Sequence, residues 1–163
     1  MTDTQKKPLW KNELVWLFLL TSGLFAILYS KFILGGYAYV FTDTGADTMQ
    51  INYAQYGLFS SLFRSGESGY VLQAGLGMDV SSYYPAYLIP YNLLILLAPQ
   101  RLLPWAVLAS AYLKMITISL VGYLFYRKLM QDGIGTMAAA LAWTFSGYVI
   151  LWGQHYGFCT CMA

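Results

Sequence analysis

The chain has 163 residues, of which 58% are hydrophobic, 18% aromatic and only 10% charged. Soluble domains carry roughly 25% charged residues, and a small globule still has a large surface to solvate. The composition therefore excludes a soluble enzyme, a nucleic-acid-binding protein and a disordered chain, and it predicts a protein surrounded by lipid. The formal net charge of +2 is less informative than the positions of the charges along the chain.

The first predicted membrane span covers residues 14–34, which are apolar except for one lysine. At about 1.5 Å per residue, this run is long enough to cross a hydrocarbon core about 30 Å thick. The run is longer than the apolar region of a signal peptide and has no small-residue cleavage site, so we interpret it as an uncleaved span. Because Lys6, Lys7 and Lys11 precede it, the positive-inside rule predicts a cytoplasmic N-terminus and an outer loop over residues 35–82.

The outer loop contains a second pattern. Between residues 50 and 64, apolar side chains recur at helical spacing with polar side chains between them, which predicts a short amphipathic helix lying in the membrane interface. Residues 65–82 are rich in Gly and Ser. Tyrosines are frequent between Tyr70 and Tyr91, as is typical of segments at the level of the lipid headgroups.

Further apolar runs follow the outer loop. Residues 83–98 are apolar but contain two prolines, and they either belong to a span over about 83–103 or enter and leave on one side as a re-entrant segment. Residues 105–126 are predicted to span the membrane, and so are residues 136–152. The predicted fold is therefore all-α, a multi-pass bundle of three to four transmembrane helices that forms one domain over 1–163.

The basic residues after the loop leave two topologies open. If residues 83–98 cross the membrane, Arg101 is cytoplasmic and the Arg127-Lys128 pair lies outside. If the segment is re-entrant, Arg127 and Lys128 are cytoplasmic and Arg101 lies outside. We prefer the crossing at this point, because it keeps Arg101 on the same side as the N-terminal lysines.

Two carboxylates, Asp43 and Asp47, stand four residues apart just after the first span. Such a pair can supply a general base or bind a cation, and sharing a boundary of low dielectric constant raises the pKa of one member. The alternative is structural, since Asp47 precedes the predicted amphipathic helix and can be its N-cap. The residues alone leave both interpretations open.

Lys114 is the other outlier, because it lies near the centre of the span over 105–126. An unpaired charge there costs about 2.5–3.5 kcal/mol, so such a residue usually faces the bundle interior or a water-filled cavity with an anionic partner. The alternative is a shifted span from which Lys114 reaches the interface. His155 is the only histidine, and a lone histidine among aromatics is more often an interfacial hydrogen-bonding residue than a catalyst.

The order of several short motifs is more specific than any one of them. They are, in chain order, Gly35-Gly36-Tyr37, the acidic run Phe41 to Thr48, Gly75-Leu76-Gly77, Tyr83-Tyr84-Pro85, Pro90 to Leu94, Lys114 within a span, Phe145-Ser146-Gly147-Tyr148 and Trp152-Gly153-Gln154-His155. This series resembles the N-terminal part of YfhO-type bacterial membrane proteins, which belong with the GT-C superfamily of glycosyltransferases. The resemblance covers residues 30–158.

The resemblance implies a bacterial cell-membrane glycosyltransferase that moves a sugar from a polyprenyl-phosphate donor to a cell-envelope polymer such as lipoteichoic acid. It implies a catalytic role for Asp43 or Asp47, as a base or as a carboxylate associated with a divalent cation. Gln50, Lys114 and His155 are then the candidate substrate-binding residues. We add that Lys114 suits the donor phosphate, an inference from its charge and not a family assignment.

Two alternatives accompany this interpretation. The chain can be a non-enzymatic subunit for transport or assembly, in which Lys114 lines a polar pathway and Asp47 only caps a helix. It can also be an inactive gene fragment, because GT-C enzymes usually have eight or more spans while the predicted spans here number at most four. Under that expectation the chain keeps the acidic loop but is too short to complete the donor pocket.

Overall fold

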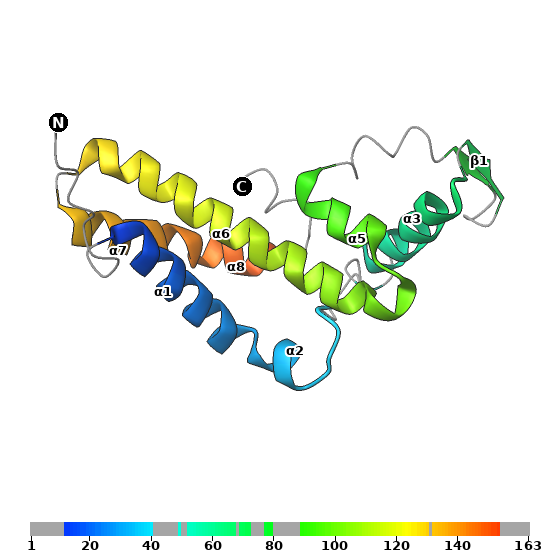
Figure 1. Ribbon diagram of the computed structural model, residues 1–163, viewed down its shortest axis with the longest axis horizontal. Helices are drawn as coiled ribbons and strands as arrows, with labels where there is room; N and C mark the ends of the chain where they lie inside the picture. Colours follow the sequence, from blue (N-terminus) through cyan, green and yellow to red (C-terminus); the bar gives the residue numbers. More distant parts are fainter. Residues whose placement is uncertain are drawn as a thin grey trace, which may run out of the picture.

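The computed structural model shows a predominantly helical protein (Figure 1). The residues that it describes are 12–40, 49, 52–67, 69–72, 77–79, 89–130 and 132–153. The longer helices are α1 (Glu13–Leu28), α3 (Ala54–Ser65), α6 (Leu103–Leu129) and α7 (Gly133–Thr144). The short elements are α2 (Ser30–Leu34), α5 (Leu93–Leu97), α8 (Gly147–Trp152), the 3-10 turns η4 (Pro90–Asn92) and η5 (Gln100–Leu102), and the strands β1 (Tyr70–Val71) and β2 (Met78–Asp79).

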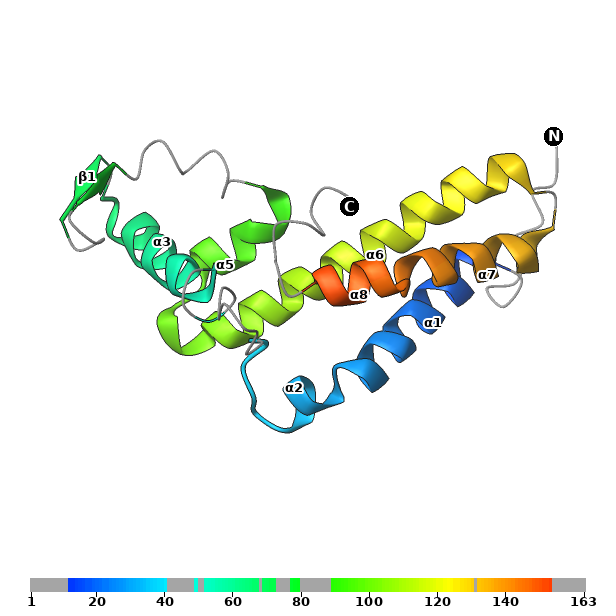
Figure 2. The ribbon, with the colours of Figure 1, turned by 180° about the vertical axis from the view of Figure 1, so that it is seen from behind.

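Helix α6 is the axis of the molecule. In Figures 1 and 2, α1 and α7 lie beside one half of α6, whereas α3, α5 and β1 gather around its opposite end. The strands form a small antiparallel ribbon in which Tyr70 pairs with Asp79 and Val71 with Met78. The molecule therefore has a helix bundle of α1, α6 and α7 at one end. At the other end lies a group made of α3, α5 and the β1–β2 ribbon, which we call the cap.

Helices α1 and α6 are antiparallel. Near the start of α1, Glu13 accepts a hydrogen bond from the Tyr123 hydroxyl near the end of α6. Further along α1, the Thr21 and Ser119 hydroxyls are hydrogen-bonded at 2.9 Å, and both side chains are fully buried. Within a membrane, hydrogen bonds of this kind and close packing hold helices together, because lipid provides no hydrophobic drive for helix association.

Basic side chains lie at the bundle end where α6 finishes. Arg127 Nη1 lies 3.5 Å from Glu13 Oε2, and Lys128 follows it in the last turn of α6. Gly133, the first residue of α7, lies directly beside the Glu13 carboxylate, because a Cβ added to it would overlap that group. The start of α1, the end of α6 and the start of α7 therefore share one end of the bundle.

Helix α7 begins and packs for identifiable reasons. Asp132 is its N-cap and accepts hydrogen bonds from the backbone N–H groups of Ile134 and Gly135, at 3.2 and 2.6 Å, which satisfies donors that a helix start leaves free. Gly122 of α6 faces Ala140 of α7, and small residues at such a contact allow two helix backbones to approach closely.

The cap is held together by hydrogen bonds that join α3 to the segment before α6. The Ser60 hydroxyl donates to the Ala98 carbonyl at 2.7 Å, and the Gln100 amide donates to the Gly57 carbonyl at 2.6 Å. A hydrophobic cluster of Phe59, Leu62, Val71 and Leu96 fills the space beside them. Helix α3 overlaps most of the segment 50–64 where the sequence predicts a helix and ends one residue beyond it. Its position in a membrane interface stays a prediction.

One predicted span differs from the structure. Over its described part, the segment 83–103 is broken into η4, α5 and η5 and is not one continuous helix. Proline accounts for the breaks, because Pro90 begins the first turn and Pro99 holds the preceding Ala98 in an extended conformation. Since α1 and α6 are antiparallel neighbours, the chain between them also leaves and returns at the same end of the bundle. This packing favours the re-entrant alternative over a single crossing, and whether the segment crosses a membrane stays a prediction.

Two helical segments of the described chain are long and apolar enough to cross a membrane, Gln100–Leu129 and Gly133–Trp152. The first contains the predicted span 105–126, and the second contains 136–152 with a break between α7 and α8. The apolar helix α1, of 16 residues, ends before the predicted limit of 34, and α2 continues it after a turn. These lengths and compositions indicate a membrane protein.

Candidate functional site

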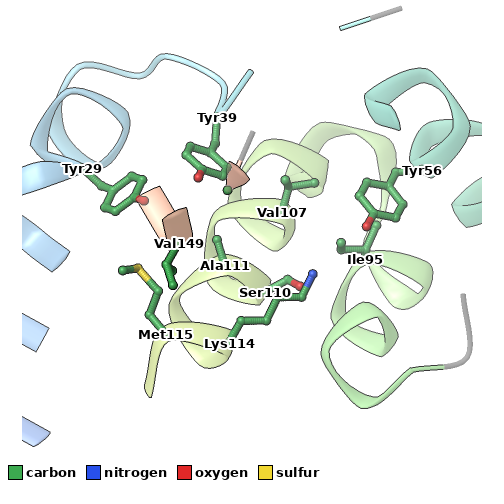
Figure 3. A pocket seen from close by; sticks show the side chains of 11 residues that line it. Tyr29, Tyr39, Tyr56, Ile95, Val107, Ser110, Ala111, Lys114, Met115 and Val149 are labelled. Atoms are coloured by element: carbon green, nitrogen blue, oxygen red, sulfur yellow. The ribbon is translucent and has the colours of Figure 1, made fainter. Parts of the chain in front are cut away.

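A pocket lies where the cap meets the bundle. The space between its walls, together with open solvent at its mouth, amounts to about 400 Å³, and only a small part of it is enclosed. Its walls come from α6, from the segments that follow α1, and from α3, α5 and α8 (Figure 3). The lining residues are Tyr29, Tyr39, Tyr56, Ile95, Val107, Ser110, Ala111, Lys114, Met115, Val149 and Gly153. Apolar and aromatic walls with a few polar groups are the usual composition of a ligand site.

Tyrosines from separate parts of the chain form much of this wall. Tyr29 occupies the turn after α1, Tyr39 follows α2, and Tyr56 lies in the first turn of α3. The rings of Tyr29 and Tyr39 meet edge to face at 5.3 Å, and Phe25 stacks on Tyr29 at 4.4 Å. The Tyr56 hydroxyl donates to Asn92 Oδ1 at 3.4 Å. Ring packing and hydrogen bonding thus fix the wall before any ligand enters.

Lys114 contributes the charge. It lies in the middle of α6, and its side chain is only 4% exposed. In Figure 3 it extends from α6 toward the side of the pocket where Tyr56 and Ile95 lie. The sequence prediction that Lys114 faces the interior is confirmed. A buried ammonium is costly to desolvate, and an anion with good hydrogen-bonding geometry is the group that compensates this cost.

Ser110 lies one helical turn before Lys114 and is 1% exposed. Its Oγ is the only buried side-chain nitrogen or oxygen without a hydrogen-bond partner in the described part of the chain. Leaving a buried hydroxyl unpaired is unfavourable by about 1–3 kcal/mol. The Ser110 hydroxyl is therefore a candidate to form a hydrogen bond with a ligand that enters the pocket.

Among the site residues predicted from the sequence, Lys114 is the one that the structure places. Asp43, Asp47, Gln50 and His155 lie outside the described residues. Within the described ranges, no cluster of three or more His, Cys, Asp or Glu side chains could hold a metal ion. The predicted divalent cation beside Asp43 or Asp47 concerns residues beyond those ranges and stays a prediction.

The comparisons with known proteins add no further identification. No family model, curated protein or solved structure matches the chain. The resemblance to YfhO-type proteins rests on the sequence motifs alone.

Sequence reasoning did not identify the tyrosines or Ser110. Ser110 could have been found, because residues four apart on a helix share a face, and Lys114 was already a candidate. The tyrosines carried no such signal, since Tyr29, Tyr39 and Tyr56 belong to segments that only the folded chain brings together.

Proposed function

We propose that this chain belongs to a bacterial cell-membrane glycosyltransferase that takes its sugar from a polyprenyl phosphate and passes it to a cell-envelope polymer such as lipoteichoic acid. The observation that carries the proposal is Lys114, a buried lysine in a pocket lined by tyrosines. In this proposal its ammonium group binds the donor phosphate through charge-assisted hydrogen bonds.

The proposed orientation follows from the antiparallel packing of α1 and α6. Arg127 and Lys128 lie at the bundle end where α1 begins, and Lys6, Lys7 and Lys11 precede α1 in the sequence. By the positive-inside rule, this end is cytoplasmic. The pocket and the cap are then at the outer side, where α3 lies in the interface and α1, α6 and α7–α8 provide three crossings.

The acidic loop enters the proposal through its place in the chain. Tyr39 lines the pocket and precedes the segment that carries Asp43 and Asp47, while Gly153 lines it and precedes His155. The lipid-linked donor would therefore be held beside Tyr39 and Gly153, which precede the other predicted site residues in the sequence.

The proposed reaction is a single displacement at the sugar. Asp43 or Asp47 takes the proton from an acceptor hydroxyl, and the resulting oxygen forms a bond to the anomeric carbon. The bond between that carbon and the phosphate oxygen breaks, and polyprenyl phosphate leaves with one more negative charge. Lys114 stabilises this charge as it develops, and an interaction that is stronger in the transition state accelerates the reaction.

Sugar transfer in membranes tests the proposal. Lys114→Met, Asp43→Asn and Asp47→Asn are introduced at the chromosomal locus, and incorporation of labelled sugar from polyprenyl phosphate into envelope polymer is measured. We expect Lys114→Met and at least one aspartate variant to reduce transfer by about 100-fold, the scale of losing one charge-stabilising group. Lys31→Met, at an exposed lysine of α2, is the matched control and should retain transfer.

Unchanged transfer in Lys114→Met membranes that contain normal amounts of the protein would refute the assignment of Lys114. Unchanged transfer in both aspartate variants would refute the catalytic role of the acidic loop. Normal transfer combined with loss of polymer export would favour the transport alternative, in which Lys114 lines a polar pathway.

A further inference from the structure

Other hydroxyl groups in the helices of this protein, including two in α6 itself, have ordinary hydrogen-bond partners. Thr117 donates to the Leu113 carbonyl at 3.0 Å, and Thr144 donates to the Ala140 carbonyl at 2.8 Å, each one turn back along its own helix. Ser119 pairs with Thr21 of the neighbouring helix at 2.9 Å. These bonds show that this fold offers partners to helical hydroxyls both within a helix and between helices.

Ser110 differs from them. It lies well inside α6, where a serine can turn its hydroxyl toward the carbonyl one turn back, yet among the described residues its Oγ has no partner. Figure 3 shows that the hydroxyl points from α6 toward the side of the pocket where Tyr56 and Ile95 lie, which is also the direction taken by Lys114. An unpaired donor thus points into a pocket beside a cation.

The apolar side chains that line the rest of the pocket strengthen the hydrogen bonds that Ser110 and Lys114 can donate to an anion. Ile95, Val107, Met115 and Val149 are fully or almost fully buried and line the same pocket. Apolar side chains keep water away from a bound anion, and hydrogen bonds to it are stronger in such surroundings. A neutral hydroxyl and an ammonium one turn apart can each donate to a different oxygen of one phosphate group.

We propose that Ser110 is a second binding residue of this site, donating its hydroxyl hydrogen bond to an oxygen of the phosphate group whose charge Lys114 balances. The phosphate is that of a phosphate ester carried on a lipid, so the inference rests on the proposed function for its ligand class. Ser110 recognises the phosphate and not the sugar, and the site therefore binds polyprenyl phosphate even when no sugar is attached.

Binding of sugar-free polyprenyl phosphate tests this assignment. The purified chain in detergent is titrated with radiolabelled short-chain polyprenyl phosphate, with inorganic phosphate in a second arm. We expect Ser110→Ala to weaken binding by about 10-fold or more, as for loss of a hydrogen bond to a charged group. Thermal unfolding of the variant without ligand should be unchanged or slightly shifted upward, because the change removes an unpaired buried hydroxyl.

Ser119→Ala is the matched control, being a buried serine of the same helix outside the pocket lining. It loses the bond to Thr21, so it should lower thermal stability and leave the affinity unchanged. A second measurement combines Ser110→Ala with Lys114→Met. If both groups bind the same phosphate, the loss in the double variant should differ from the sum of the single losses.

Equal affinity of wild type and Ser110→Ala would overturn the inference, and so would an equal loss in Ser119→Ala. Binding of inorganic phosphate with the same Ser110 dependence would support the assignment with a free ion as the source. Ser110-dependent binding of polyprenyl phosphate without any sugar transfer would support the inference while refuting the proposed function. Transfer that depends on Lys114 but not on Ser110 would do the reverse.

Discussion

Replacement of Gly122 with isoleucine tests the close contact between α6 and α7. A Cβ at Gly122 would lie 3.4 Å from Trp143 Cδ1 and 3.7 Å from the Ala140 Cα. Optimal carbon–carbon contacts are about 3.5–4.0 Å, so one methyl group fills the space and leaves no room for more. The further carbons of isoleucine would overlap α7 unless the two helices move apart.

The expected loss follows from these distances. Overpacking of a close contact costs about 1–3 kcal/mol, and we expect Gly122→Ile to lower the free energy of unfolding by this amount. Gly122→Ala should change it by less than about 1 kcal/mol, because the methyl group fits and glycine is itself unfavourable within a helix. The measurement is equilibrium unfolding in mixed detergent micelles, followed by circular dichroism.

Gly23→Ile provides the matched control. Gly23 lies within α1 on an exposed position, and a Cβ there meets no atom within 4 Å. Isoleucine at this position should change the free energy of unfolding by no more than about 0.5 kcal/mol. Equal losses for Gly122→Ile and Gly23→Ile would refute the reasoning, because the penalty would then come from isoleucine in a helix and not from the contact with α7.

Three other predictions concern separate parts of the molecule. A double-mutant cycle with Thr21→Val and Ser119→Ala should give a coupling free energy of about 0.6 kcal/mol, typical of hydrogen bonds between membrane helices, and a value of zero would contradict the pairing. Burial raises the pKa of the Tyr53 hydroxyl above its ordinary value of 10.0. The folded state then holds this proton more tightly than the unfolded state, so stability is retained below pH 10.0 and lost as the pH rises through the folded pKa; Tyr53→Phe should remove that loss in unfolding titrations. In intact cells, Lys128→Cys should react with an impermeant thiol reagent only after the cytoplasmic side is opened and Arg101→Cys without opening, and the reverse pattern would refute the proposed orientation.

The fold could be predicted from the sequence where local composition decides it. The long apolar run of α6 is helical because a buried or lipid-covered backbone must satisfy its own hydrogen bonds, and length and hydrophobicity alone reveal such a run. The segment around Pro90 and Pro99 was harder, since its apolar composition favoured a span while its prolines interrupt the helix. For the candidate site, Lys114 was predictable, because a charge within an apolar run is unfavourable unless the fold gives it a partner.

By itself, the sequence determined that the chain is helical and suited to a membrane, and that Lys114 lies deep within one of its apolar helices. Only the tertiary structure decided that α1 and α6 are antiparallel, which puts Arg127 beside Glu13 and returns the intervening chain to the same end of the bundle. Only it decided that Tyr29 and Tyr56 form a pocket with Lys114 and that Ser110 lacks a partner there. Composition and periodicity describe neighbours along the chain, whereas a pocket depends on which helix faces meet in space.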